Sequence, residues 1–132
     1  MQLQLQDNLL FTQIKIAYRE TVLEINHVLI DTGSASTIIA AELVESIDIY
    51  PEPTDKLHII RGVGGSEVVF VKQLDYFQLG EQRIEHFKVE IGAMDYGFTI
   101  NAILGLDFLL STHAVLDLGE MQIRFEQQGL NR

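Results

Sequence analysis

Apolar and polar residues alternate with a period of two along most of this 132-residue chain. Leu3 and Leu5 alternate with glutamines, and Ile14, Ile16 and Tyr18 alternate with polar or small residues. This period is typical of β-strands, because successive side chains of a strand point to opposite faces of its sheet. The pattern therefore predicts a protein built mostly of strands.

The strands are expected to pair through short turns. Arg19 and Glu20 separate two apolar segments and predict a hairpin over residues 18–23. The run from Val28 to Ile30 is apolar at consecutive positions, which predicts a strand that is buried on both faces and ends at Asp31. Further strands are predicted over residues 57–60, 68–71, 74–79, 84–91, 100–104, 114–118 and 121–125.

Two short helical segments are expected between these strands. Ser36 or Thr37 is predicted to cap a helix that runs to residue 47. Asp107 is predicted to cap a single helical turn over residues 108–110. We therefore expect one all-β domain over residues 1–132, folded as a small closed or partly closed β-barrel with one or two short helices.

The composition narrows the function classes. The formal net charge is −10 and 47% of the residues are hydrophobic, so the chain can form a core but its surface repels nucleic acids and anionic membranes. The absence of cysteine excludes disulfides, thiolate metal sites and cysteine nucleophiles. The four histidines are scattered without the spacing of a metal site. We expect no metal, no cofactor and no nucleic-acid partner.

The start of the chain gives an expectation about location. Residues 1–6 have neither the basic start nor the apolar run of a signal peptide. No segment approaches the roughly 18 consecutive apolar residues of a membrane span. Together with the absence of cysteine, these features predict a cytoplasmic protein with no membrane partner.

The first motif with possible chemistry is Asp31-Thr32-Gly33, at the end of a buried strand. A carboxylate at a strand end can activate water if it faces an open cleft. Gly33 lets the chain turn away without a Cβ in that cleft, and the threonine hydroxyl supplies a hydrogen-bonding group. The alternative interpretation is an ordinary strand-end turn.

The second motif is the glycine-rich segment Gly62-Val63-Gly64-Gly65, between two predicted strands. Such a hairpin tip exposes backbone amides and can close over an extended ligand. A phosphate-binding loop is disfavoured, because no lysine followed by serine or threonine comes next and Glu67 adds negative charge. A plain glycine-rich turn remains the structural alternative.

The third motif is Ile103-Leu104-Gly105, followed by Leu106-Asp107-Phe108-Leu109. Two branched apolar residues before a glycine are suited to support the Asp31 loop from below. By itself this segment predicts only a core strand and a turn.

In this order and spacing, the three motifs resemble those of retropepsin-like aspartic proteases, a group that includes retroviral proteases and their cellular and bacterial relatives. The resemblance covers residues 11–125, and the segment after Gly105 is closest to the cellular and bacterial branch. One difference is Leu106, because viral members usually have a basic residue after this glycine.

The resemblance implies an aspartic endopeptidase that acts on peptide or protein substrates as a homodimer. Two carboxylates about 3 Å apart cannot both ionise, so the two Asp31 side chains would share a proton and activate water between them. It implies catalytic roles for Asp31, Thr32 and Gly33. It further implies substrate contacts from Ser34, Ala35, Gly62, Val63, Gly64 and Gly65, and structural support from Ile103, Leu104, Gly105 and Asp107.

Two finer expectations follow from the same resemblance. The two Thr32 residues would link across the dyad, and the Ser34 hydroxyl would hydrogen-bond Asp31. Two other functions stay open at this point: a non-catalytic module of the same fold that dimerises or binds peptides, and a β-barrel binding domain with chance motif matches. The sequence does not indicate the substrate or which chain terminus would form a dimer sheet.

Overall fold

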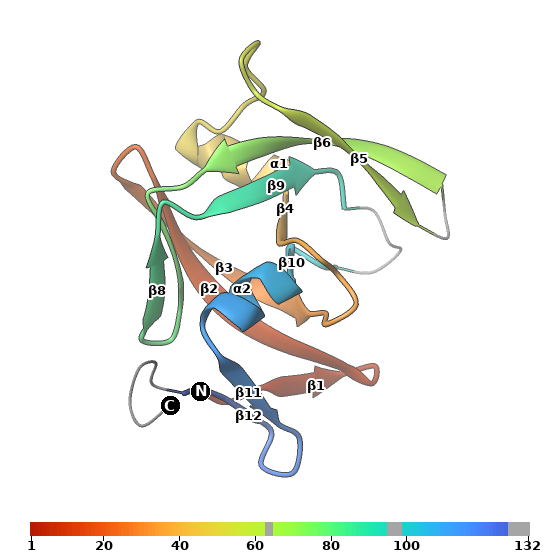
Figure 1. The fold of residues 1–132 in the computed structure, drawn as a ribbon, viewed down its shortest axis with the longest axis vertical. Helices are drawn as coiled ribbons and strands as arrows, with labels where there is room; N and C mark the ends of the chain where they lie inside the picture. The colour runs from red at the N-terminus through yellow and green to blue at the C-terminus, as the bar shows by residue number, and fades with distance from the viewer. Residues whose placement is uncertain (63–64, 95–98, 127–132) are drawn as a thin grey trace.

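The computed structural model describes residues 1–62, 65–94 and 99–126 (Figure 1). Two short α-helices, α1 (Ala41–Val44) and α2 (Leu106–Ser111), and one 3-10 turn, η1 (Glu45–Ile47), accompany the strands. The prediction of a mostly β protein with short helices is confirmed. In chain order the strands are β1 (Gln4–Gln6), β2 (Leu9–Tyr18), β3 (Thr21–Ile30), β4 (Ile38–Ala40), β5 (Leu57–Gly62), β6 (Gly65–Gln73), β7 (Tyr76–Leu79), β8 (Gln82–Glu85), β9 (Lys88–Gly92), β10 (Ala102–Leu104), β11 (Ala114–Asp117) and β12 (Gln122–Phe125).

The main sheet follows the order β5-β6-β9-β4-β10-β3-β2-β7-β8, and β1 pairs with β2 beside this path. β11 and β12 form a separate hairpin, which lies at the opposite end of the molecule from β5 and β6 (Figure 1). Within the described residues β5 and β8 do not pair with each other, so the sheet is open. The closed form of the predicted barrel is therefore wrong.

The predicted hairpin over residues 18–23 is confirmed by the pairing of β2 with β3. Arg19 and Glu20 form its two-residue turn with φ angles of 48° and 72°. Positive φ at both turn residues matches the right-handed twist of the paired strands. The Glu20 amide also donates to Asp75 Oδ2 at 2.8 Å, which holds this turn against the β6–β7 connection.

The insertion of β10 between β3 and β4 positions the candidate site. β10 is parallel to β3, with Leu104 beside Ile30, and antiparallel to β4. Parallel neighbours end at the same edge of a sheet, so the residues that follow β3 and β10 lie side by side. Asp31 and Gly105, 74 positions apart in the chain, are neighbours for this reason.

The predicted helix from Ser36 or Thr37 to residue 47 is wrong in its first part. Residues 38–40 are strand β4, and the helix begins only at Ala41. Ile38 and Ile39 are β-branched and buried, and they pair with strands on both sides. Tertiary pairing and burial therefore outweigh the local helical pattern.

The predicted strand over residues 84–91 is two strands. β8 ends at Glu85 and β9 begins at Lys88. His86 has a φ of 56° between them, a conformation that interrupts an extended strand.

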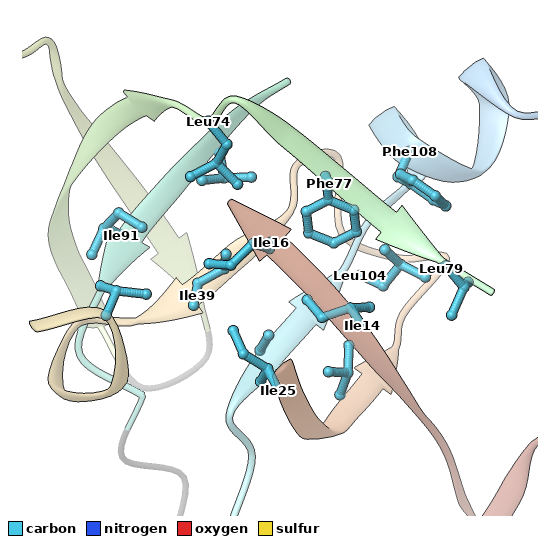
Figure 2. Close-up of a cluster of buried hydrophobic side chains, with 14 of the residues drawn as sticks. Ile14, Ile16, Ile25, Ile39, Leu74, Phe77, Leu79, Ile91, Leu104 and Phe108 are labelled. Atoms are coloured by element: carbon cyan, nitrogen blue, oxygen red, sulfur yellow. The ribbon is translucent and has the colours of Figure 1, made fainter. Parts of the chain in front are cut away.

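A continuous apolar core lies between strands of the curved main sheet, and α2 contributes Phe108 on one side (Figure 2). Phe108 of α2 packs against Phe77 of β7, with ring centroids 5.0 Å apart. Each is fully buried, and burial of a side chain of this size contributes roughly 1.5–3 kcal/mol. Because Phe108 follows Gly105 by only three residues, the core fixes the segment beside the candidate site.

The N-terminal residues attach to the C-terminal hairpin of the same chain. The Met1 amino group donates to the Ile123 carbonyl at 2.9 Å, and the Leu3 amide donates to the Met121 carbonyl at 2.8 Å. No helix in the described ranges is long and apolar enough to cross a membrane.

Candidate active site at the end of strand β3

Asp31 follows β3 directly and is half-buried. Its amide donates to the Leu104 carbonyl at 3.0 Å, and its carbonyl accepts from the Ser34 amide at 3.1 Å. The Gly33 amide donates to the carboxylate oxygen Oδ1 at 2.9 Å. The backbone of the Asp31–Ser34 turn therefore holds the carboxylate in one orientation.

Gly33 lies close to the carboxylate oxygen that its amide contacts. A Cβ added at Gly33 would lie 3.1 Å from Asp31 Oδ1. A larger residue here would fit only if the Asp31 carboxylate moved by a few tenths of an ångström. This agrees with the sequence argument for a glycine at the turn.

Of the remaining residues of the loop, some are exposed to solvent and others hold the loop in place by hydrogen bonds. Thr32 and Ala35 are exposed. Ser34 supports the loop, because its hydroxyl donates to the Ser36 carbonyl at 2.7 Å and its carbonyl accepts from the Leu106 amide at 2.8 Å. The expected hydrogen bond from Ser34 to Asp31 is not present, because the hydroxyl turns toward Ser36.

Gly105 lies directly against this loop. A Cβ at Gly105 would meet the Ser36 carbonyl carbon at 2.5 Å, the Ser36 carbonyl oxygen closer still, and the Ser34 carbonyl oxygen at 2.9 Å. These are backbone atoms, so no rotation of a side chain relieves the clash. With the buried residues Ile103 and Leu104 of β10, the third motif packs beneath the first.

Asp107 joins the same assembly through Thr37. The Asp107 carboxylate accepts from the Thr37 amide at 3.0 Å and from the Thr37 hydroxyl at 2.7 Å. The Thr37 hydroxyl in turn accepts from the Gly105 amide at 3.1 Å. Asp107 lies in the first turn of α2, whose N-cap is Gly105, so the predicted capping role is wrong. Its carboxylate instead fixes the chain that leaves the Asp31 loop.

Thr37 and Glu90 are the site residues that the sequence did not identify. Thr37 is fully buried, and its partner Asp107 is distant in the chain, so no local pattern indicates the contact. Glu90 lies in β9 and bonds the Ser36 hydroxyl and His58. A single glutamate in an apolar strand pattern carries no sign of these two partners.

The glycine-rich segment lies at the tip of the β5–β6 hairpin. The predicted strands over residues 57–60 and 68–71 are confirmed, and Gly62 pairs with Gly65 at the end of the ladder. Val63 and Gly64 lie outside the described residues. β6 pairs with β9, and β9 pairs with β4, so the hairpin belongs to the same sheet as the segment after Asp31.

The base of the hairpin is held by an ion cluster around the buried side chain of Lys72. The Lys72 ammonium lies 2.6 Å from Glu52 Oε1 and 2.8 Å from Asp55 Oδ2, and its side chain is 4% exposed. The hydrogen bond from Lys72 lowers the pKa of Glu52. Burial acts to raise the pKa of Asp55, but hydrogen bonds from Lys72 and the Glu52 amide outweigh it and lower that pKa. Burial acts to lower the pKa of Lys72, and the two carboxylates outweigh it and raise that pKa.

The chemistry available at the site is that of one oriented carboxylate beside an exposed hydroxyl, Asp31 and Thr32. Among the described residues, no three histidine, aspartate or glutamate side chains are grouped as a metal site. One Asp-Thr-Gly occurs in the sequence, so a pair of such carboxylates requires two copies of the chain.

Comparison with known proteins identifies the family. The sequence profile of an aspartyl protease family matches residues 22–108, which is well over half of the chain and contains all three motifs. No curated protein sequence matches the chain. The matched stretch begins in β3 and ends in α2, so it includes the Asp31 loop and the strand that supports it. The chain belongs to the aspartyl protease family, of the retropepsin-like kind.

Proposed function

We propose that this chain is an aspartic endopeptidase that acts as a homodimer and hydrolyses peptide bonds with one Asp31 from each subunit. The observation that carries the proposal is the geometry of Asp31. Its carboxylate is oriented by the Gly33 amide, in a loop that Gly105 and Asp107 support from the core side. An Asx-turn alone supplies the contact with Gly33, so the proposal depends on that contact together with the support from Gly105 and Asp107 and the family match over residues 22–108.

The mechanism follows from the single proton that two adjacent carboxylates share. Two such groups share one proton, because two negative charges at this separation repel strongly. The ionised Asp31 takes a proton from a bound water as that water attacks the scissile carbonyl carbon. The protonated Asp31 of the other subunit donates its proton to the carbonyl oxygen. The resulting tetrahedral species then expels the amine, which leaves with a proton from the dyad.

Other parts of the chain supply binding and alignment in this proposal. Thr32 is exposed in the single chain, which suits a contact between the two subunits beside the dyad. The backbone of the glycine-rich tip at residues 62–65 would hydrogen-bond an extended peptide, as in the addition of a strand to a sheet edge. The substrate is a peptide or protein segment that enters in extended form.

Asp31→Asn tests the proposal directly. The amide cannot act as a base, so peptide cleavage should fall roughly a thousandfold or more. Asp48→Asn is the matched control, because Asp48 is exposed and has a positive φ that asparagine tolerates. A mixed peptide library, digested at several pH values and analysed by mass spectrometry, measures both variants. Equal cleavage by Asp31→Asn and the parent chain would refute the dyad.

The assembly is tested separately. Light scattering at micromolar concentration should give twice the 14.9 kDa chain mass for the parent chain and for Asp31→Asn. A strict monomer that still cleaves peptides contradicts the shared site. Activity should be greatest at acidic to mildly acidic pH, where the pair holds one proton. Activity that rises above pH 8 contradicts a mechanism in which the pair holds one proton.

A further inference from the structure

Glu90 joins two segments that are far apart in the sequence. The Ser36 hydroxyl, in the loop after Asp31, bonds Glu90 Oε1. His58 Nδ1, on the outer hairpin strand β5, lies 2.8 Å from Glu90 Oε2. The Glu90 side chain is 10% exposed, so both carboxylate oxygens are engaged away from bulk water.

The position of Glu90 itself is fixed by the sheet. Its amide donates to the Thr37 carbonyl at 2.9 Å. In the ladder it lies opposite Ile38 of β4 on one side and Val71 of β6 on the other. A carboxylate on a central strand of this kind is a rigid reference point for the groups that bind it.

Two hydrogen bonds connect Ser36 to Asp31. The Ser36 carbonyl accepts from the Ser34 hydroxyl, and the Ser34 amide donates to the Asp31 carbonyl. Gly105 packs closely against the Ser36 carbonyl. Ser36 therefore contacts Gly105 and Glu90, and it is hydrogen-bonded to the Asp31 turn through Ser34.

The contact with His58 reaches the hairpin from the other side. His58 is paired with Val69 across β5 and β6, whereas Glu90 lies on β9, one strand further in. The side-chain contact therefore crosses β6 and ties the outer strand of the hairpin to the body of the sheet. In the described residues β5 has a strand partner only on its β6 side, so this tie adds a restraint that the ladder does not supply.

We propose that Glu90 is a positioning residue that sets the β5–β6 hairpin relative to the Asp31 loop, through His58 on one side and Ser36 on the other. The inference rests on the proposed peptidase function, in which the hairpin and the loop grip the same peptide. Glu90 does not touch the substrate or the reacting atoms. Its loss should weaken peptide binding and leave the chemical step intact.

A purely structural contact between His58 and Glu90 makes a different prediction. The His58 side chain is 54% exposed, and pairs with an exposed partner contribute little to folding stability. A structural role would therefore change nothing, or would lower the melting temperature without a selective effect on KM. The two roles are separated by kinetics rather than by stability alone.

His58→Phe tests the proposal, because it keeps a ring and removes Nδ1. KM for a cleaved peptide should rise about three- to tenfold, the range of one lost charge-assisted hydrogen bond, with kcat within about twofold. His58→Asn should restore most of the affinity, since its amide nitrogen lies near the place of Nδ1. Lys88→Gln is the control, because Lys88 lines the same recess as His58 and Glu90 and should leave KM unchanged.

Amide hydrogen exchange provides a measurement that does not need activity. In His58→Phe and in Glu90→Gln, exchange of the amides in residues 57–60 should become faster, whereas that of β2 and β3 should not change. If the parent chain cleaves no peptide, the proposed function fails, and hydrogen exchange still tests whether the contact between Glu90 and His58 holds the hairpin. Unchanged KM together with unchanged exchange overturns the inference. So does a rise in KM that His58→Asn does not restore.

Discussion

The Asp31 loop and the β5–β6 hairpin are held in place by different kinds of interaction. The loop lies against fully buried neighbours, and the Gly105 backbone touches it without room for a methyl group. The hairpin lies at the end of the sheet (Figure 1). The outer face of the hairpin exposes Leu57, Ile59 and Val68, each more than 60% accessible.

The difference matters for the proposed chemistry. A catalytic carboxylate must stay within a fraction of an ångström of its working position, and close steric packing provides that. In the proposed mechanism the hairpin closes over a peptide and must also open, so we expect it to belong to the less stable part of the fold. Its base is held by the ions of Lys72, Glu52 and Asp55, which depend on pH, whereas the contact at Gly105 does not.

The largest expected effect is that of Gly105→Ala. The added methyl group collides with backbone atoms of Ser36 and Ser34, so the loop or β10 must move. We expect a loss of about 3 kcal/mol of folding free energy and loss of cleavage. Gly119→Ala is the control, because its Cβ would meet only Asp117 Oδ1 at 3.5 Å. Urea unfolding compares the two, and equal stability would contradict the close packing of the loop.

Thr37→Val should have the next largest effect. It keeps the shape of a fully buried side chain, but it leaves the Gly105 amide without its acceptor and removes the hydroxyl hydrogen bond to Asp107, which keeps its bonds from backbone amides. The expected loss is about 2 kcal/mol. The matched control is Thr112→Val, since the Thr112 hydroxyl donates only to helix carbonyls. Similar losses for the two variants in urea unfolding would remove the special role of Thr37.

Lys72→Met should change how stability depends on pH. The lowered pKa of Asp55 means that its contribution is present above its usual value of 3.8 and is lost as the pH falls further. The raised pKa of Lys72 means that its contribution is present below 10.5 and is lost as the pH rises further. The lowered pKa of Glu52 adds a contribution that is present above its usual value of 4.5, so the cluster stabilises the fold fully between about pH 5 and pH 10.

The melting temperature measures this effect. At neutral pH Lys72→Met should lower it by about 3–5 °C, and the decline of the parent chain below about pH 5 should become shallower in the variant. Lys56→Met is the control, because Lys56 is exposed and lies next to Asp55 in the segment before β5. If the melting temperature of the variant falls with decreasing pH as steeply as that of the parent chain, the cluster does not cause the acid sensitivity.

The smallest effect is expected on the outer face of the hairpin. Val68→Thr should change the free energy of unfolding by less than about 0.5 kcal/mol, because the side chain is exposed. Val69→Thr, one residue further along β6, places a hydroxyl at a buried position and should cost about 1–3 kcal/mol. Thermal unfolding of the two variants separates the faces, and a large loss for Val68→Thr would show that this face is covered.

Much of the fold follows from local patterns in the sequence. The period-two alternation predicted the β2–β3 and β5–β6 hairpins, because an alternating segment can bury only one face as a strand. Asp31-Thr32-Gly33 indicated the candidate site, since an acid and a glycine after a buried strand specify a tight turn. The motif at residues 103–107 was located correctly, although the role of Asp107 as a helix cap was wrong.

The sequence by itself predicted most of the strands, and it determined where the acidic turn lies and that each chain carries one such turn. Only the tertiary structure decided that Ile38–Ala40 is a strand, that Thr37 meets Asp107, and that Glu90 meets both Ser36 and His58. The physical reason is the distance along the chain over which each kind of interaction acts. Turn and strand preferences act between near neighbours, whereas these contacts exist because β10 inserts between β3 and β4 and brings distant segments together.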